Sequence, residues 1–242
     1  MGPAQFPAVF GCFESPLESR QFEKCLWTQS DRFMKDSAQM PLADAVNERG
    51  TQHLARAARF ANVERFVFLS TGLTYGSNGG RLADENDACK PLEAYPKSKL
   101  AAEKMLLGME DVDVRILRLP FVYGDGDPHI EEAIPFMRGF PPSQRMSISH
   151  HVDVAQAVSL LLDAQSPSHR IYNVADDEAP DLAALFAAVG QPPPDGTSAE
   201  RASNFDALLD GRRIRQDLKF RPTFPKLEDA IKADALDQAW SK

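Results

Sequence analysis

The sequence lacks several features that define large classes of proteins. Its apolar runs are all shorter than the ~20 residues needed to cross a bilayer, so we expect no membrane association. Only three cysteines are present, Cys12, Cys25 and Cys89, and they form no C-x-x-C pair. This spacing suggests neither a disulfide framework nor a metal site, and it favours a reducing, cytoplasmic compartment. The N-terminus has no basic start followed by an apolar core, so we expect no secretory signal.

Basic residues are outnumbered by acidic ones. The chain has 27 Lys and Arg against 35 Asp and Glu, a formal net charge of -8. Bulk electrostatics therefore argue against a nucleic-acid partner, although a local basic pocket could still bind an anionic small molecule. No G-x-S-x-G turn is present to support a serine nucleophile. A chain of 242 residues with 43% hydrophobic residues suits one large domain, or one domain with a small lobe.

Short β-rich runs alternate with helical periods after Pro41. The predicted strands are 65–71, 112–120, the start of SISHHVDVAQAVSLLLDAQ, and 171–176. The predicted helices are 43–61, 95–109, the rest of SISHHVDVAQAVSLLLDAQ with Asp153 as its N-cap, 180–190, and two short helices around RPTFP. The predicted loops are 72–93, 121–129 and 191–198, and residues 1–40 show no clear period.

This alternation predicts an α/β fold with a parallel sheet covered by helices on both faces. In such sheets ligands bind at the carboxyl ends of the strands. Those ends are Ser70-Thr71, Pro120-Phe121 and the segment after Val174. The chemistry is therefore expected where these three strand ends meet.

One helix start carries a candidate acid/base pair. In AYPKSKLAAEK, Tyr95 and Lys99 are four residues apart, so their side chains share a helix face. A tyrosine with an ordinary pKa of ~10 is a poor base at neutral pH, and a nearby ammonium favours the phenolate. Lowering the pKa by ~3 units takes ~4 kcal/mol of differential interaction. Thr71 ends the preceding predicted strand and could hold the oxygen that exchanges the proton.

The structural alternative to each of these signals is common. A bare Y-x-x-x-K occurs often by chance, and a Ser-Thr pair at a strand end is usually only a polar terminus. A strand, a loop and a helix that carry these residues in this order favour the functional interpretation.

Several motifs occur in order along the chain: NERGTQHLARAA, FVFLSTGLTYG, Asp84-Glu85, AYPKSKLAAEK, VRILRLPFVYGDGD and SHHVDVAQAV. Together they resemble the extended short-chain dehydrogenase/reductase family, the NAD-dependent epimerase/dehydratases. The resemblance covers about residues 41–235. It implies a Rossmann-like parallel sheet flanked by helices, a small C-terminal substrate lobe, and NAD or NADP as cofactor. It also implies a homodimer that forms through the helices at about 43–61 and 95–109.

The resemblance implies a role for each matching residue. Tyr95 would be the catalytic acid/base, Lys99 would hold the nicotinamide ribose and lower the pKa of Tyr95, and Thr71 would hydrogen-bond the reacting oxygen. The implied cofactor-binding residues, besides Lys99, are Asn47, Ser70, Pro120, Phe121 and Val122. His150 matches the histidine of the family, where a substrate contact and a structural hydrogen bond both remain open. Arg212 and Arg213 are candidate substrate-binding residues, with a solvated helix face as the alternative.

Two departures from the family pattern matter. Dehydratases of the family carry an acidic pair just after the Ser/Thr, whereas this sequence has Gly72 and Leu73, which argues against 4,6-dehydration. The family also opens with a Gly-rich turn that receives the cofactor pyrophosphate, but only Gly2 and Gly11 precede Gly50 here. We therefore expect an N-terminally shortened fold, with a divergent segment over 1–40 and the Rossmann-type domain with its discontinuous lobe over 41–242.

Two functions of different classes remain open from the sequence. The first is an NAD(P)-dependent oxidoreductase or epimerase that acts on a carbinol or carbonyl centre of a nucleotide sugar or of a small alcohol or ketone. The second is a catalytically inert family member, a fragment or a binding or regulatory protein, which keeps Thr71, Tyr95 and Lys99 but binds no dinucleotide.

Overall fold

The structure, a computed structural model, describes residues 10–14, 22–27, 44–197 and 205–236. The chain divides into two compact units. The first comprises the residues up to Ser70 together with Glu93–Leu117, and the second comprises Thr71–Leu92 and the residues from Arg118 onward. Each unit is described by itself below.

A sheet with helices against it forms the first unit. Its strands are β1 (Phe10–Glu14), β2 (Phe22–Trp27), β3 (Arg65–Thr71) and β5 (Asp113–Leu119), adjacent in that order. β2 and β3 are parallel, with Cys25 opposite Phe66, whereas β1 and β2 are antiparallel. The predicted parallel sheet is thus confirmed for β2 and β3, and β1 adds an antiparallel pair.

Strand β3 occupies the predicted residues 65–71, and every one of its residues is buried. A strand buried on both faces reads as a continuous apolar run, which is how RFVFLST appears in the sequence. Its central residues Phe66, Val67 and Phe68 are completely inaccessible to solvent. Residues 65–70 of β3 therefore lie in the core of the first unit.

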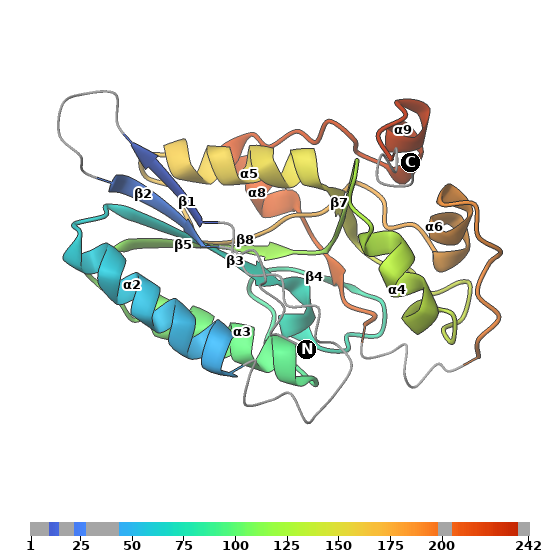
Figure 1. The fold of residues 1–242 in the computed structure, drawn as a ribbon, viewed down its shortest axis with the longest axis horizontal. Helices are drawn as coiled ribbons and strands as arrows, with labels where there is room; N and C mark the ends of the chain where they lie inside the picture. Colours follow the sequence, from blue (N-terminus) through green and yellow to red (C-terminus); the bar gives the residue numbers. More distant parts are fainter. Residues whose placement is uncertain (1–9, 15–21, 28–43, 198–204, 237–242) are drawn as a thin grey trace, which may run out of the picture. The chain divides into compact units, whose positions relative to one another are not determined.

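Two helical segments of the first unit run side by side (Figure 1). The predicted helix over 43–61 is a π-helical turn, η2 (Asp44–Gly50), which continues as α2 (Thr51–Phe60). The predicted helix over 95–109 is α3 (Ala94–Leu107). Pro96 lies in its first turn, where a missing N–H costs nothing because the amides there have no partner within the helix.

The second unit consists of short elements around its own core. Its strands are β4 (Leu82–Ala83), β6 (Phe121–Tyr123), β7 (Ile148–His150), β8 (Ile171–Asn173) and β9 (Leu208–Leu209). Its helices are η3 (Gly72–Tyr75), α4 (His129–Met137), α5 (His151–Asp163), α6 (Leu182–Ala188), α8 (Arg212–Leu218) and α9 (Leu227–Lys232). β6 pairs with β7 and β4 pairs with β9, both in parallel.

Several parts of the second unit agree with the sequence expectations. The short strand and helix within SISHHVDVAQAVSLLLDAQ are β7 and α5, and two short helices flank RPTFP. α6 is followed by Gly190, whose positive φ of 68° suits the glycine that ends a helix. Val174, just after β8, donates its backbone N–H to the carbonyl of Arg118.

The N-terminal segment contains strands that its sequence did not reveal. We expected no regular period over 1–40, and β1 and β2 lie within it. A strand of five or six residues spans barely three periods of alternation, which is too few to stand out from noise. The rest of the expected divergent segment lies outside the described residues, and so does any structure that would replace the Gly-rich turn.

Three further expectations for the second unit were wrong. The predicted loop 72–93 contains η3 and β4, and the predicted loop 121–129 begins with β6. The helix α4 was not predicted at all. Asp153 is not the N-cap of α5, because His150 holds that position with an extended backbone and accepts a hydrogen bond from Val152 N–H. The carboxylate of Asp153 instead accepts backbone N–H groups from a distant segment, at 2.5 Å from Thr223 and 3.1 Å from Phe224. Asp153 thus fixes the RPTFP segment on α5.

Candidate functional site

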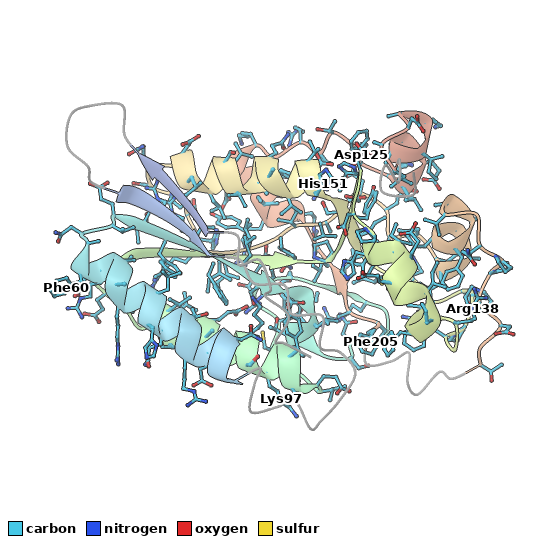
Figure 2. The ribbon with its side chains drawn as sticks, viewed as in Figure 1. Phe60, Lys97, Asp125, Arg138, His151 and Phe205 are labelled. Atoms are coloured by element: carbon cyan, nitrogen blue, oxygen red, sulfur yellow. The ribbon has the colours of Figure 1, made fainter. Side chains whose placement is uncertain are left out.

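The first turns of α3 carry the predicted pair on one helix face. The ammonium nitrogen of Lys99 lies 6.0 Å from the centroid of the Tyr95 ring. Tyr95 is half-buried, and Lys99 is only 1% exposed. Lys97, between them in sequence, is exposed, and its side chain points away from the helix pair (Figure 2). The first unit therefore brings Tyr95 and Lys99 together, as their spacing predicted.

Strand β3 holds the buried charge of Lys99. Its Nζ donates a hydrogen bond of 2.9 Å to the carbonyl oxygen of Leu69 and lies 4.7 Å from the centroid of the Phe68 ring. A carbonyl dipole and an aromatic face both favour a cation that has left water.

Asn47 is linked to the same helix through a serine. Its Nδ2 donates to Ser98 Oγ at 3.0 Å, and Ser98 Oγ donates to the carbonyl oxygen of Tyr95 at 2.8 Å. The backbone carbonyl of Asn47 accepts a 2.5 Å hydrogen bond from Thr51 Oγ1. Asn47, Thr51 and Ser98 are all buried. The π-helical turn η2 and the first turn of α3 are thus tied together by side chains.

Two buried polar atoms of the first unit have no hydrogen-bond partner among the described residues: Asn47 Oδ1 and Ser70 Oγ. Unsatisfied buried polar groups are rare in folded proteins and call for an explanation. An amide oxygen and a hydroxyl suit a ligand rich in hydroxyl and amide groups, such as the ribose and nicotinamide portions of a dinucleotide. Ser70 and Asn47 therefore fit the cofactor group that the resemblance implies.

Thr71 follows Ser70 directly and belongs to the second unit. It caps η3, because its Oγ1 accepts a 3.3 Å hydrogen bond from Leu73 N–H. Thr74 Oγ1 donates back to the carbonyl of Thr71 at 2.9 Å. The bond from Leu73 N–H holds the side chain of Thr71, and because Thr71 Oγ1 is the acceptor in it, the hydroxyl proton is left to donate elsewhere.

The three residues after β5 that the resemblance assigns to the cofactor are Pro120, Phe121 and Val122, and all are half-buried. The Phe121 ring stacks on His129 with 4.3 Å between centroids. His129 Nδ1 lies 3.2 Å from the carbonyl of Val122 and donates to it. Gly124 follows with a φ of 157°, and a Cβ at that position would lie 2.2 Å from the His151 ring. The backbone after β6 therefore needs a glycine at position 124.

His150 has both ring nitrogens engaged within the second unit. Nδ1 accepts from Val152 N–H at 3.3 Å, so Nε2 carries the proton and donates to the carbonyl of Ala235 at 3.0 Å. Burial lowers the pKa of His150, a shift that the Ala235 carbonyl partly opposes. This neutral, doubly bonded ring favours the structural alternative over a substrate contact.

We expect His150 to make the protein less stable in mild acid. An unfolded histidine takes up a proton near pH 6.5, whereas His150 in the folded protein does so only at lower pH. Below about pH 6.5 the unfolded state therefore binds more protons, and the free energy of unfolding falls with pH. Urea unfolding at pH 7.5 and pH 5.5 measures this loss. His150→Gln should reduce it, and His53→Gln, at an exposed position, should leave it unchanged; an equal effect of both variants would contradict the assignment.

The two candidate substrate arginines differ in their surroundings. Arg212 is exposed and pairs with Asp210, whose Oδ2 accepts from Arg212 Nε at 2.7 Å. Arg213 lies 3.3 Å from Glu85 Oε2 and donates to Asn86 Oδ1 at 2.8 Å and to the Ile171 carbonyl at 3.3 Å. Arg213 is therefore engaged with the loop after η3 and with β8, whereas the Arg212 side chain faces solvent.

Two residues in notable positions were not singled out in the sequence. Ser98 precedes Lys99, and its position three residues after Tyr95 was the available signal for a bond back to the Tyr95 carbonyl. Asp176, three residues after β8, is buried, and a sequence alone cannot show that a carboxyl group is desolvated. Among the described residues, no group of three or more His, Cys, Asp or Glu side chains could hold a metal ion, and no helix is both long and apolar enough to cross a membrane.

Parallel strands flanked by helices, with a Tyr–Lys pair on the helix that follows the Ser-Thr strand, define a Rossmann-like α/β protein. The NAD dependent epimerase/dehydratase family matches residues 34–175, more than half of the chain. The chain belongs to this family.

Two relatives that the chain resembles are named for nucleotide sugars. A dTDP-4-dehydrorhamnose reductase of Streptomyces griseus is 33% identical over 103 residues, which cover 43% of this chain and 33% of that protein. A human dTDP-D-glucose 4,6-dehydratase is 31% identical over 145 residues, which cover 53% of this chain and 40% of that protein. The matched part is thus well under half of each relative. The structure of MoeE5 in complex with UDP-glucuronic acid and NAD matches the fold with a TM-score of 0.73 and 24% identity, over 91% of this chain and 79% of that chain.

Proposed function

We propose that this chain carries an NAD(P)-dependent oxidoreductase or epimerase site for a carbinol or carbonyl centre, in a nucleotide sugar or in a small alcohol or ketone. The observation that carries the proposal is the half-buried Tyr95 beside the buried Lys99, whose ammonium is held by Leu69 and Phe68. Proton transfer at a carbinol or carbonyl oxygen needs a group tuned towards neutral pH, and a tyrosine beside a fixed cation meets that need.

Each residue of the set has one task in this proposal. Tyr95 gives or takes the proton, Lys99 stabilises the phenolate and binds ribose hydroxyls, and Thr71 donates a hydrogen bond to the reacting oxygen. Asn47 and Ser70 accept or donate hydrogen bonds on the cofactor side. The nicotinamide, when bound, supplies the hydride acceptor or donor. Pro120, Phe121 and Val122 provide a partly apolar surface beside it, and a homodimer through α2 and α3 remains part of the proposal.

The relatives support the substrate class, and the sequence narrows the reaction. Nucleotide sugars appear in the names of the matched proteins and in the MoeE5 complex. The acidic pair that dehydratases use is replaced by Gly72 and Leu73. Epimerisation or simple carbonyl reduction is therefore favoured over 4,6-dehydration.

Calorimetric titration of the purified chain with NAD⁺, NADH, NADP⁺ and NADPH tests the cofactor part. We expect micromolar binding that Lys99→Met weakens by about tenfold or more, while Lys97→Met, on the exposed side of the same turn, leaves it unchanged. Thermal melting of both variants shows whether they are folded. If no cofactor binds at millimolar concentration, the chain is an inert member of the family and the enzymatic proposal fails.

Turnover of UDP- and dTDP-hexoses and of small secondary alcohols, followed by the absorbance of the reduced cofactor and by product chromatography, tests the chemistry. Tyr95→Phe should keep cofactor affinity and lose about 10² to 10⁴ in kcat, the usual contribution of a positioned acid or base. A Tyr95→Phe variant with unchanged kcat would remove Tyr95 from the reaction.

A further inference from the structure

The Asn47–Ser98–Tyr95 bonds form a relay of two hydrogen bonds with the Ser98 hydroxyl in the middle. Asn47 Nδ2 donates to Ser98 Oγ, which in turn donates to the Tyr95 carbonyl, at 3.0 and 2.8 Å. The Ser98 hydroxyl therefore works as donor and acceptor at once, which fixes its rotamer. Ser98 is only 2% exposed and Asn47 only 1%, so water does not compete for these bonds.

The relay ends on the backbone in the first turn of α3, the helix that carries Tyr95 and Lys99. A serine that bonds back to the carbonyl three residues earlier competes with the regular helix ladder and usually perturbs it slightly. Here the same hydroxyl is also held by Asn47, 51 residues away in sequence. The Ser98 hydroxyl that bonds back to the Tyr95 carbonyl is thus also held by a residue outside α3. The peptide group of Tyr95 is linked in this way to η2.

The support itself has unusual local geometry. Asn47 lies in the π-helical turn Asp44–Gly50, and π-helical turns are rare and often occur at functional sites. Thr51 Oγ1 bonds to the Asn47 carbonyl at 2.5 Å and so holds the turn at the point where α2 begins. The turn directs the Asn47 amide at Ser98.

We propose that Ser98 is a positioning residue, which fixes the phenol of Tyr95 beside Lys99 by coupling the first turn of α3 to Asn47. This inference deepens the proposed function and rests on it, because it assigns a task to Ser98 only if Tyr95 moves the proton. Small displacements of a catalytic group by about 1 Å can cost about a hundredfold in rate.

Ser98→Ala removes both bonds and tests the proposal by activity. We expect kcat to fall about ten- to a hundredfold, with KM and cofactor affinity within about twofold of wild type. Ser98→Thr keeps the hydroxyl and should restore most of kcat. Ser159→Ala, on the exposed face of α5, is the matched control and should change nothing. An unchanged kcat in Ser98→Ala, or a loss that Ser98→Thr does not rescue, overturns the proposal.

A second measurement needs neither cofactor nor turnover. In ring-labelled tyrosine NMR, with Tyr95→Phe used to assign the signal, Ser98→Ala should move the midpoint of the Tyr95 pH titration upward, because the phenol loses its fixed place beside the ammonium. Asn47→Leu removes the donor at nearly constant volume without adding a charge, and should have the same effect. The Ser98→Ala/Asn47→Leu double variant should equal the single variants, since one relay is broken in each case.

The two measurements separate the possible failures. If the wild type has no turnover but its Tyr95 titration depends on Ser98, the proposed function fails and the relay stands. If turnover depends on Tyr95 while neither kcat nor the titration depends on Ser98, the proposed function stands and the relay proposal fails. A Ser98→Ala protein that does not fold is replaced by Asn47→Leu, which nearly keeps the volume of the side chain and adds no charge.

Discussion

Replacing Asn173 by leucine is expected to lower the free energy of unfolding by about 3 to 5 kcal/mol. Asn173 is fully buried, and its amide joins three segments of the second unit. Its Oδ1 accepts from Tyr75 Oη at 2.8 Å, and its Nδ2 donates to the carbonyls of Ala83 at 3.0 Å and Asp210 at 3.4 Å. Leucine has nearly the same volume but no polar atoms, so these buried partners lose their bonds at about 1 to 3 kcal/mol each.

The neighbouring bonds make this loss cooperative. The backbone N–H of Asn173 donates to Glu85 Oε1 at 2.7 Å, and burial raises the pKa of Glu85 although that hydrogen bond and Arg213 oppose the rise. Burial also raises the pKa of Tyr75 to about 12, so its phenol stays protonated and donates at neutral pH. The packing of η3 and β4 against β8 therefore depends on the side-chain amide of Asn173.

Urea unfolding of the wild type, Asn173→Leu, Tyr75→Phe and the double variant measures the effect. Tyr75→Phe alone leaves Asn173 Oδ1 without its partner, so the double variant should be less destabilised than the sum of the two single variants. Strict additivity would mean that the Tyr75–Asn173 bond contributes little. A loss below about 1 kcal/mol in Asn173→Leu would show that the amide is not the junction described here.

Replacing Asp176 by asparagine is expected to stabilise the protein at pH 8 and to have little effect at pH 4. Burial raises the pKa of Asp176 to about 8, and the nearby Asp153 adds to the rise, while Ser149, Tyr123 and Arg215 oppose it. Asp176 Oδ2 accepts from Tyr123 Oη at 3.3 Å. Asp176 Oδ1 and Ser149 Oγ are buried and have no hydrogen-bond partner among the described residues.

The direction of the effect follows from proton binding. An unfolded aspartate ionises near pH 3.8, whereas the folded protein keeps Asp176 protonated up to about pH 8. Between these values the folded state binds more protons, so the free energy of unfolding falls as pH rises through this window. At about 1.4 kcal/mol per pKa unit, the asparagine variant should gain on the order of 3 to 5 kcal/mol at pH 8.

Urea unfolding of the wild type and Asp176→Asn at pH 4, 6 and 8 tests this prediction. The difference between the two proteins should grow with pH, which separates it from the opposite trend expected for His150. Asp195→Asn, at an exposed position, is the control and should show no such growth. If Asp176→Asn destabilises the protein equally at all three pH values, the carboxyl group is ionised and makes bonds that the amide cannot replace.

Much of the arrangement around Tyr95 and Lys99 was predictable from local sequence. The spacing of Tyr95 and Lys99 determines a shared helix face once α3 forms, whatever the rest of the chain does. The apolar run RFVFLST determines a buried strand, and β3 occupies the predicted residues. Both inferences depend on periodicity within a few turns or residues, which a sequence records directly.

What the tertiary structure decided depends on contacts between distant residues. The bond between Asn47 and Ser98, the desolvation of Asp176 and the junction at Asn173 each involve groups that are 23 or more residues apart along the chain. The true partner of Asp153, on the RPTFP segment, is of the same kind. A sequence pattern determines local geometry and the helix or strand face on which a side chain lies. Desolvation and long-range hydrogen bonds exist only when the chain has folded, and they determine which polar groups are held in place and which are charged.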